Sequence, residues 1–510
     1  MFCMVDFTEM ILRPHLDDYK IIGYYLGKIT ISIGIAMMIP FVIAIGYSEW
    51  QCAVDFLLSI SFTLLAGALL SIICYTKKDL ATMHAMAVAA LSWIVAMLVS
   101  AVPLYLSGHF GSYLDASFEA MSGYATTGLS LAVNLDHMAN SYNFWRHFIM
   151  FMGGQGIVVI ALTFLVRGTA GAFRMYVGEA RDEKIMPNVV ETARFIWLVS
   201  MVYMVLGSGA LSIAAIWGGL PPLKAIFDSV CIFMAAWDTG GFTPQSQSIL
   251  FYHNFPFEII TISLMFLGAM NFALHYAVWT GNRRELYRNI EIVTLFVSII
   301  VTLSITAWGV LEKNVYSQSL PFSSKTFYHL ISGHTGTGYT TIYARQFVNE
   351  WGALAMFGVT LAMAIGGSVC STTGAIKVFR IGVIYKALRQ DIKRMLIPDT
   401  AIFVQKIHHI KDVVLEDKYV RMSTIILISY INLYIFGAIA GMLCGYSLSE
   451  ALFESVSAAA NVGLSCGITS PSMPAALKVV YIFQMWAGRL EFVAVMVLLG
   501  MVIATFKGKR

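Results

Sequence analysis

The sequence predicts an all-α polytopic membrane protein in which four tandem units surround one axis with pseudo-fourfold symmetry, after an N-terminal pair of accessory helices. Each unit is expected to contain a span, a short re-entrant helix with its loop, and a second span. The 510-residue chain is 58% hydrophobic and 12% charged, with mean hydropathy +0.74, which is typical of proteins that cross a bilayer many times. A short frame ending in glycine also recurs four times between the predicted spans.

Ten segments are long and apolar enough to cross a membrane as helices, which takes about 20 residues. The first two precede any repeated frame, so we expect an accessory pair in residues 1–80. The remaining chain divides into four units, at residues 81–168, 169–284, 285–395 and 396–510. The predicted spans are residues 24–47, 52–75, 84–106, 144–166, 191–217, 254–280, 289–312, 350–388 with a break, 421–444 and 475–504.

The repeated frame starts with an aromatic residue and a polar or acidic neighbour, has a small residue four positions after the aromatic one, and ends in glycine. The glycine comes ten positions after the aromatic residue in three units and four residues later in the second, which predicts a re-entrant helix about one turn longer there. The frames are Phe118-Glu119, Ser122 and Gly128; Phe227-Asp228, Cys231 and Gly241; Tyr328-His329, Ser332 and Gly338; and Phe453-Glu454, Ser457 and Gly463.

Basic residues predict the orientation, because Lys and Arg near the ends of spans stay on the cytoplasmic side. With both termini there, that side collects 26 of the 33 Lys and Arg residues, the side of the four glycines collects six, and Arg489 lies inside the last span. We therefore expect a multi-pass protein of the cytoplasmic membrane, embedded in the lipid bilayer, with both termini cytoplasmic and the four loops entering from outside. The polar segment from Met1 to Lys28 does not resemble a cleavable signal peptide.

Several classes of function are disfavoured. The net charge of +4 follows from the topology and does not indicate a nucleic-acid partner. The seven cysteines form no CxxC pair or metal-binding spacing, so we assign them no chemistry and expect no cofactor. A membrane-embedded hydrolase would need a His-Glu-x-x-His helix or facing Ser/His or Asp residues, and neither pattern occurs, so we do not expect an enzyme. A structural or receptor-like protein would not require four matched loops. We interpret His408-His409, on a connector, as a solvated turn.

Glycine at the end of each frame indicates a close approach of backbones. Non-helical backbone at membrane depth is tolerated only where protein buries it or where it lines a watery path, and rings of backbone carbonyls can replace the hydration shell of an ion. Glycine permits the required dihedral angles, and the short helix before it directs a partly negative end toward a cation. The sequence thus predicts one cation-binding ring. Its residues would be Thr127, Gly128, Gly240, Gly241, Thr337, Gly338, Val462 and Gly463.

Carboxylates near the loops have two interpretations, and the sequence leaves both open. They could give the outer vestibule an acidic bias that concentrates cations, or each could be the partner of a helix N-terminus. The residues concerned are Glu119, Asp228, Asp238, Glu350, Glu450 and Glu454.

The second span of the third unit cannot continue comfortably as a helix. Its sequence GGSVCSTTGAIK, at residues 366–377, is rich in Gly, Ser and Thr, and broken helices at membrane depth mark pathways. We expect this segment beneath the ring, where it could obstruct the path and move aside. GGQG, at residues 153–156, instead favours close helix packing. The candidate gate residues are Gly366, Gly367, Ser368, Ser371, Thr372, Thr373, Gly374, Lys377 and Arg489.

Arg489 is costly inside a membrane and is therefore a functional candidate. It could neutralise Glu491, which is near in sequence but not on the same helical face, or it could face the path, where a fixed positive charge would oppose cation residence. We favour the second interpretation.

Together, the four loops and the segments GGQG (153–156), NFALHY (271–276), GGSVCSTTGAIKVFR (366–380) and GRLEF (488–492) resemble the Trk/Ktr/HKT superfamily of potassium transporters, and most closely its TrkH-type membrane subunit. The resemblance covers roughly residues 80–505. It implies four M1–pore helix–M2 repeats, a potassium-selective filter at the four glycines with K⁺ as the transported ion, a gate in the broken span, and a pore-directed Arg489. Cys370 and Ala375 stand where we expect the family's loop to have glycine.

The resemblance also implies a homodimer that docks a cytoplasmic nucleotide-binding regulatory subunit of the RCK/KTN type, similar to TrkA. The chain has no dinucleotide fingerprint of its own, consistent with regulation by a separate protein. The expected function is passive potassium uptake through a filter and a gate. The alternative is Na⁺- or H⁺-coupled K⁺ symport, which would need a second ion site and alternating access, whereas the four units do not resemble inverted repeats.

Overall fold

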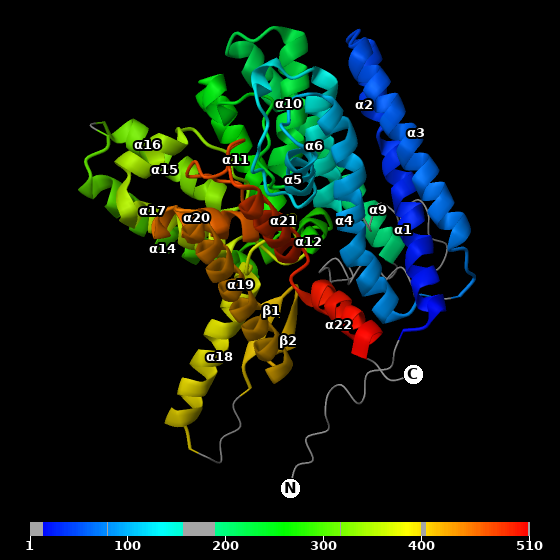
Figure 1. Cartoon of the computed structure of the whole chain (residues 1–510). Coiled ribbons are helices and arrows are strands. Elements are labelled where there is room, and N and C mark those ends of the chain that lie inside the picture. The colour runs from blue at the N-terminus through cyan, green and yellow to red at the C-terminus, as the bar shows by residue number, and fades with distance from the viewer. Residues whose placement is uncertain (1–13, 79, 157–188, 317, 399–403, 508–510) are drawn as a thin grey trace.

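The computed structural model describes residues 14–78, 80–156, 189–316, 318–398 and 404–507. Within this part of the chain the protein is helical except for loops and one two-stranded hairpin. Long helices surround shorter ones that reach only part of the way through the molecule (Figure 1). The predicted all-α polytopic class is therefore confirmed.

Six helices of the described residues are long and apolar enough to cross a membrane, if α1 and α2 are counted as one. They coincide with six of the predicted spans, and their outward faces carry exposed Leu, Ile, Val and Phe side chains of the kind that contacts lipid. These helices are α1 (Leu16–Ala36) with α2 (Met38–Gly46), α3 (Trp50–Ile73), α4 (Thr82–Leu106), α9 (Val189–Trp217), α14 (Ile290–Glu312) and α19 (Asp417–Leu443).

Three of the other four predicted spans are broken. Residues 254–280 and 475–504 were expected as single crossings, but each forms two helices bent by 101° and 112° respectively. In the first pair the Asn271 side chain accepts a hydrogen bond from the amide of Ala273 (2.8 Å) and so starts a new helix. The helices are α11 (Phe255–Ala269) with α12 (Phe272–Trp279), α17 (Gly352–Ile365) with α18 (Val378–Leu396), and α21 (Ala475–Arg489) with α22 (Val493–Lys507).

The second span of the first unit begins as α6 (Asn140–Gln155). The rest of the predicted span 144–166, and the predicted unit boundary at residue 168, lie outside the described residues. The unit boundaries and the count of four tandem units stay predictions.

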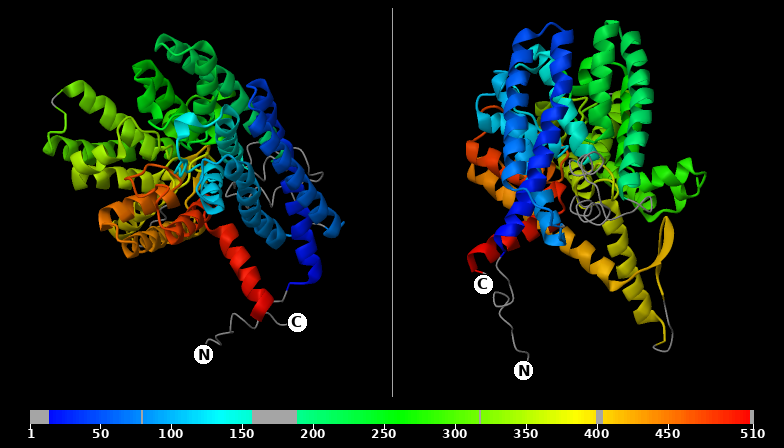
Figure 2. Two further views of the ribbon diagram at one scale, coloured as in Figure 1. Left: turned by 45° about the horizontal axis from the view of Figure 1, so that its top comes forward. Right: turned by 90° about the vertical axis from the view of Figure 1, so that its right-hand side faces the viewer.

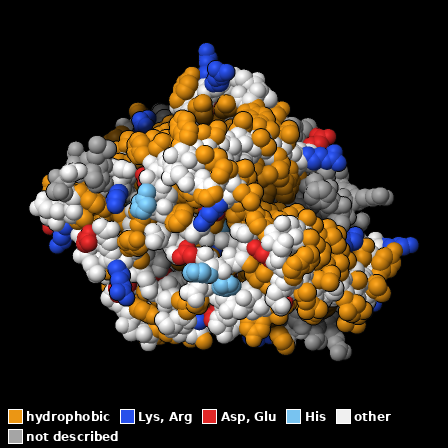
Figure 3. Space-filling view, turned by 90° about the horizontal axis from the view of Figure 1, so that it is seen from above, with side chains coloured by type: hydrophobic (Ala, Val, Ile, Leu, Met, Phe, Trp, Pro, Cys, Tyr) orange, Lys and Arg blue, Asp and Glu red, His pale blue; other side chains and the backbone are white. Residues whose placement is uncertain are grey.

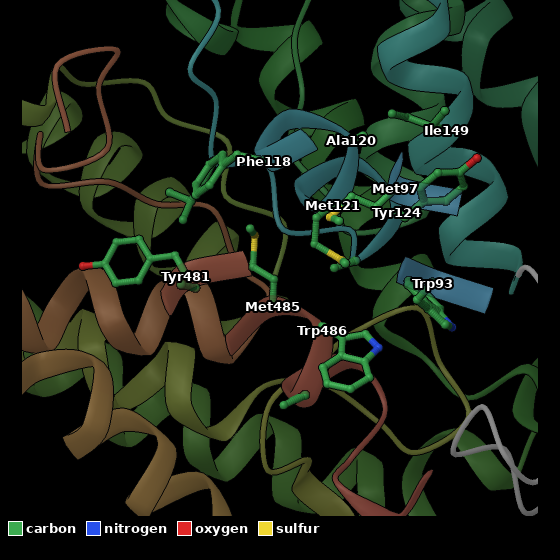
Figure 4. Packing of buried hydrophobic residues seen from close by; sticks show 14 of the residues in the cluster. Trp93, Met97, Phe118, Ala120, Met121, Tyr124, Ile149, Tyr481, Met485 and Trp486 are labelled. Atoms are coloured by element: carbon green, nitrogen blue, oxygen red, sulfur yellow. The ribbon is translucent and has the colours of Figure 1, made fainter. Parts of the chain in front are cut away.

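Four short helices occupy the interior at the predicted re-entrant positions: α5 (Tyr113–Tyr124), α10 (Pro222–Trp237), α15 (Ser319–His334) and α20 (Leu448–Ala459). The second is 16 residues long and the first 12, as the longer frame predicts, but the third also has 16. Figure 4 shows Phe118, Met121 and Tyr124 of α5 among side chains of α4 and α21, so this short helix is embedded in the hydrophobic core.

The accessory pair is fastened to the first unit. The Glu49 carboxylate, just before α3, accepts hydrogen bonds from the amides of Asn140 (2.8 Å) and Ser141 (3.0 Å), which lie in the first turn of α6. The Tyr142 hydroxyl donates to the buried Asp55 carboxylate of α3 (2.5 Å). An acidic group at a helix N-terminus is favourable, so these contacts fix α3 beside the core.

The start of α1 and the end of α22 lie at one end of the molecule, where Tyr19 and Thr505 share a hydrogen bond (Figure 1). The hairpin and the outer half of α18 project from the same end, as the right-hand view of Figure 2 also shows. The remaining elements are β1 (Lys406–His409), antiparallel β2 (Lys411–Val414), α13 (Glu285–Arg288), α16 (Ala344–Glu350) and two 3₁₀ turns, Leu135–His137 and Ser248–Tyr252.

Candidate ion pathway

Each of the four short helices ends four residues before its glycine, and each ends with the same hydrogen bond. The amide of the residue before the glycine donates to the carbonyl five positions earlier, as in a Schellman turn. These bonds join Thr127 to Ser122 (2.8 Å), Gly240 to Ala235 (2.8 Å), Thr337 to Ser332 (2.9 Å) and Val462 to Ser457 (2.9 Å). Ala235, not Cys231, therefore corresponds to Ser122, and the sequence frame of the second unit is displaced by one turn.

The four glycines form a closed cycle, which we call the glycine ring. A Cβ atom placed on any of them would overlap a backbone carbonyl oxygen of the following loop, and the fourth loop meets the first. The pairs are Gly128 with Gly240, Gly241 with Thr337, Gly338 with Val462, and Gly463 with Thr127. All eight residues predicted for the filter are thus brought together around one axis.

The backbone of the ring also requires glycine. The four ring residues have φ angles of 71–91°, a region in which side chains are strained. Two positions before them the chain is again left-handed, at Thr126, Thr239, Gly336 and Asn461, with φ angles of 50–73°. The four loops therefore share one conformation despite different sequences.

The carbonyls of Thr127, Gly240, Thr337 and Val462 accept no hydrogen bond from any described residue. A cavity of about 240 Å³ lies next to the ring. It is lined by the four ring glycines and by residues that follow each of them in the chain. Figure 3 shows the surface opposite the chain's ends, where acidic and histidine side chains lie amid polar surface. Unpaired buried carbonyls are costly unless they meet water or an ion.

The carboxylates of Glu119 and Glu454 do not line a vestibule as free charges. Each is fully buried and holds the chain just beyond the ring. Glu119 accepts hydrogen bonds from the Ser130 hydroxyl and the Leu131 amide, both at 2.9 Å. Glu454 accepts the equivalent bonds from the Ser465 hydroxyl (2.7 Å) and the Cys466 amide (2.9 Å). The acidic-vestibule interpretation is wrong for these two residues.

The other acidic candidates also have local partners. Glu450 forms a capping box with Ser447 at the start of α20, which is the alternative that the sequence left open. Asp238 is buried and accepts a hydrogen bond from the side-chain amide of Gln155 (3.0 Å). Asp228 accepts from Tyr252 (3.2 Å), and Glu350 from Gln346 (2.9 Å).

The third unit lacks the carboxylate clamp. His329 occupies the position of Glu119 and Glu454, and neither of its ring nitrogens has a hydrogen-bond partner among the described residues. Its ring instead packs against Phe347 and Trp351, at centroid distances of 4.8 and 5.3 Å. The chain beyond Gly338 is instead held by neutral hydrogen bonds, such as that from the Thr340 amide to the Ser248 hydroxyl (3.1 Å), whereas the first and fourth loops are held by charge-assisted hydrogen bonds.

Glycines of the second spans pack against the ends of the short helices. A Cβ atom on Gly153, Gly268 or Gly488 would overlap the last carbonyl of α5, α10 or α20, respectively. The packing interpretation of GGQG is therefore correct for Gly153. In the third unit, residues 366–377 take the place of such a glycine in the second span. We call these residues the α17–α18 loop.

The α17–α18 loop lies directly beneath the glycine ring, with Thr372 at its centre. The Thr372 hydroxyl donates to the carbonyls of Trp237 (3.1 Å) and Gly268 (2.9 Å), and it contacts the Thr239 hydroxyl (3.1 Å). Its carbonyl accepts from the Thr126 hydroxyl (3.4 Å). Because Thr126 and Thr239 each precede a ring glycine by two residues, Thr372 contacts two of the four loops just before the ring.

The loop's backbone is left-handed at three residues that are not glycine. The φ angles are 52° at Cys370, 66° at Ala375 and 75° at Lys377. Cys370 and Ala375 therefore keep the conformation that glycine would adopt more readily, and each costs about 1 kcal/mol or more. The surrounding contacts must supply this free energy.

Arg489 points toward the loop and the ring. Its guanidinium donates to the Thr372 carbonyl, to the Thr126 hydroxyl (3.1 Å) and to the Gly153 carbonyl (2.9 Å). Glu491 instead forms ion pairs with Lys377 (2.6 Å) and Arg380. The alternative in which Glu491 neutralises Arg489 is not observed. Gly366, Gly367, Ser368, Ser371, Thr373 and Gly374 lie in the same loop.

A family model described as TrkH, a cation transport protein, matches residues 53–503. The chain belongs to the TrkH family. Three relatives extend along nearly its whole length. An uncharacterized cation transporter of Methanocaldococcus jannaschii is 31% identical over 96% of this chain and 97% of its own. The Escherichia coli Trk system potassium uptake proteins TrkH and TrkG are 26% and 24% identical, each over 94% of this chain and 98% and 97% of their own.

The fold is also that of a solved TrkH-family structure. The crystal structure of the potassium transporter TrkH from Vibrio parahaemolyticus superimposes with a TM-score of 0.79, at 22% identity, over 94% of this chain and 98% of the other. The resemblance drawn from the sequence motifs is therefore confirmed at the level of family and fold.

Sequence reasoning missed several residues of this TrkH-family site. The acidic residue of each frame and the serine two positions after its glycine, Ser130 or Ser465, are both visible in the sequence, but nothing there indicates that they bond to one another. The Glu491 ion pairs join the bend between α21 and α22 to Lys377 and Arg380, which are distant in sequence, so no local pattern indicates them.

Replacing Glu491 by Gln should destabilise the protein strongly. Lys377 and Arg380 would be left as buried cations without their anion, a change that typically costs about 3–5 kcal/mol. The measurement is thermal unfolding of the purified protein in detergent. Glu416→Gln is the matched control, because the Glu416–Lys418 pair is more than half exposed and contributes little to stability. Equal melting temperatures for the two variants would contradict the buried ion-pair argument.

Proposed function

We propose that this protein takes up K⁺ across the cytoplasmic membrane through a channel-like pore, with the glycine ring as the selectivity filter. The observation that carries the proposal is the closed cycle of four glycines, which brings to one axis four carbonyls that accept no hydrogen bond within the described part of the chain. Dehydrated cations bind such oxygens. The names of the E. coli relatives as potassium uptake proteins support K⁺ as the transported ion.

In this proposal the α17–α18 loop is the gate. Its Thr372 occupies the exit of the ring, and Arg489 places a guanidinium against the same point. A fixed positive charge there opposes an arriving cation. Conduction therefore requires the loop to move away from Trp237 and Gly268, which supply the two carbonyls that hold the Thr372 hydroxyl.

Transport would be passive and driven by the membrane potential, since one charge moving through 100 mV yields about 2.3 kcal/mol. The termini and the hairpin would be cytoplasmic, as the distribution of Lys and Arg predicts. Assembly as a homodimer with a TrkA-like nucleotide-binding subunit is part of the proposal. Coupled symport with Na⁺ or H⁺ is the alternative, and it would show as K⁺ uptake that requires a gradient of the second ion.

Gly128→Ser should abolish the preference for K⁺ and Rb⁺ over Na⁺ and Li⁺. The new Cβ atom overlaps the Gly240 carbonyl and sits on a residue with φ of 89°, so one quadrant of the ring must open. The measurement is cation flux into proteoliposomes at a fixed inside-negative potential, with the four ions compared.

The matched control for that experiment is Gly445→Ser. Gly445 has a similar φ of 93°, but no atom lies within 4 Å of its would-be Cβ. It shares the backbone strain without the overlap in the ring. Unchanged selectivity in Gly128→Ser, or an equal loss in both variants, would contradict a filter at the ring.

Arg489→Gln should increase Rb⁺ flux several-fold at the same potential. The variant removes a positive charge and the bond to the Thr372 carbonyl, so both the electrostatic barrier and the attachment of the loop weaken. Arg421→Gln, at an exposed arginine near the start of α19, is the control. A flux in Arg489→Gln no greater than that of the parent would show that Arg489 does not restrict the path.

A further inference from the structure

The hairpin of β1 and β2 is attached to the core through its two histidines, so the interpretation of His408-His409 as a solvated turn is wrong. His408 Nε2 lies 3.1 Å from the buried Glu285 carboxylate, and its Nδ1 lies 2.7 Å from Asp412. The hydrogen bond from His408 lowers the pKa of the Asp412 carboxyl. Ile407 packs with Ile290 and other apolar residues of α14 and α18. The hairpin is therefore a docked element.

Glu291, in the first turn of α14, lies between the hairpin and the α17–α18 loop. Its side chain is only 1% exposed. One carboxylate oxygen accepts a hydrogen bond from the Val369 amide (2.6 Å), which belongs to the loop. The other accepts from the Asn271 side chain (3.2 Å) and lies 3.8 Å from His409 Nδ1. One buried carboxylate thus bonds the loop and the start of α12 and lies at ion-pair distance from the hairpin, whose His409 Nδ1 also contacts the Asn289 side chain (3.3 Å).

The hairpin reaches the second end of the loop as well. The His409 ring packs on Phe379, with the centroids 5.0 Å apart, and Phe379 is in the first turn of α18 directly after the loop. Val369, Phe379 and His409 line one cavity of about 480 Å³ between the hairpin, α18 and α19. The hairpin therefore contacts the chain just after the loop directly, and it reaches Val369, before Thr372, only through Glu291.

We propose that Glu291 is a positioning residue through which the hairpin holds the α17–α18 loop beneath the glycine ring. The inference rests on the proposed function only in that the loop is there assigned as the gate. A protein that binds the hairpin and draws it from α14 would remove His409 from Glu291 and Phe379 together. Water would then reach the carboxylate and compete for the Val369 amide, so the loop would lose its anchor.

The direction of the effect follows from the contacts. Without the Glu291 carboxylate, the first half of the loop is held chiefly by the bonds from Ser368 to Ala269 (3.0 Å) and from Phe272 to Cys370 (3.5 Å). Fewer contacts then maintain the left-handed backbone conformation of Cys370. A glutamine at position 291 still presents an amide oxygen to Val369, but a neutral acceptor forms a weaker hydrogen bond than a charged one, so the exposed population of the loop should rise about tenfold.

Cys370 is a native reporter for this motion, because it is 3% exposed and adjoins Val369. The experiment measures the rate at which a hydrophilic methanethiosulfonate reagent modifies Cys370 in the full-length protein in proteoliposomes, with the other cysteines replaced by alanine. Glu291→Gln should increase this rate about tenfold. Asp412→Asn, which removes a hairpin carboxylate that bonds His408 but has no contact with the loop, should leave it unchanged. An unchanged rate in Glu291→Gln would overturn the inference.

A general loosening of the fold is excluded with a second reporter. Cys231, fully buried in α10, is retained alone in a parallel Glu291→Gln protein. Slow modification of Cys231 beside fast modification of Cys370 supports a local role, whereas fast modification of both contradicts it.

The role of the hairpin is tested with His409→Gln, which should also increase the rate of Cys370 modification. The rate in the double variant should not exceed the rate in Glu291→Gln. Additive increases would show that the hairpin acts independently of Glu291.

Rb⁺ flux through the same proteins separates this inference from the proposed gate. Faster Cys370 modification with increased flux in Glu291→Gln supports both. Faster modification without any change in flux supports the link from hairpin to loop and contradicts the gate. Increased flux with unchanged modification overturns the link, because the loop would not have been released.

Discussion

The close contact between each ring glycine and the carbonyl of the next loop is the constraint on which the rest of the structure depends. A Cα atom can lie against a neighbouring carbonyl only if no Cβ intervenes, and here the condition is repeated four times in a closed cycle. Each short helix must then end at the same distance from the ring, and each loop must adopt the same backbone conformation. The shared hydrogen bond at the end of α5, α10, α15 and α20 and the repeated left-handed residues are consequences of that demand.

The surroundings of the ring are built to maintain this contact. Gly153, Gly268 and Gly488 bring the second spans against the last carbonyls of three short helices, and the carboxylates of Glu119 and Glu454 fix the outgoing chain. One of these buried carboxylates, Glu119, is also paired with a cation, Arg146, at 2.7 Å. Such pairs add little net stability compared with an apolar core, but they impose one geometry, and removing either partner is costly.

The sequence was sufficient for the features that depend on local pattern. The four glycines, the re-entrant helices, the break after Ile365 and the orientation of Arg489 all follow from composition, spacing or the cost of charge in a membrane. The features that were missed join segments far apart in the chain. Glu291 bonds Val369, and Glu491 bonds Lys377, yet nothing near Glu291 or Glu491 in sequence indicates a partner. The bends after Ala269 and Arg489 were missed for a related reason, because apolar residues on both sides of each bend give the hydropathy of one straight span.

The closure of the ring also has a consequence for how the protein is made. Gly463 completes the cycle by meeting Thr127, so the first loop lacks its last neighbour until nearly the whole chain has been synthesised. Until then, three loops with unpaired carbonyls must wait in or beside the membrane, where such groups are costly. The ring therefore cannot close before the fourth loop is in place, and until then the carbonyls of the first three loops need water or other polar groups as partners.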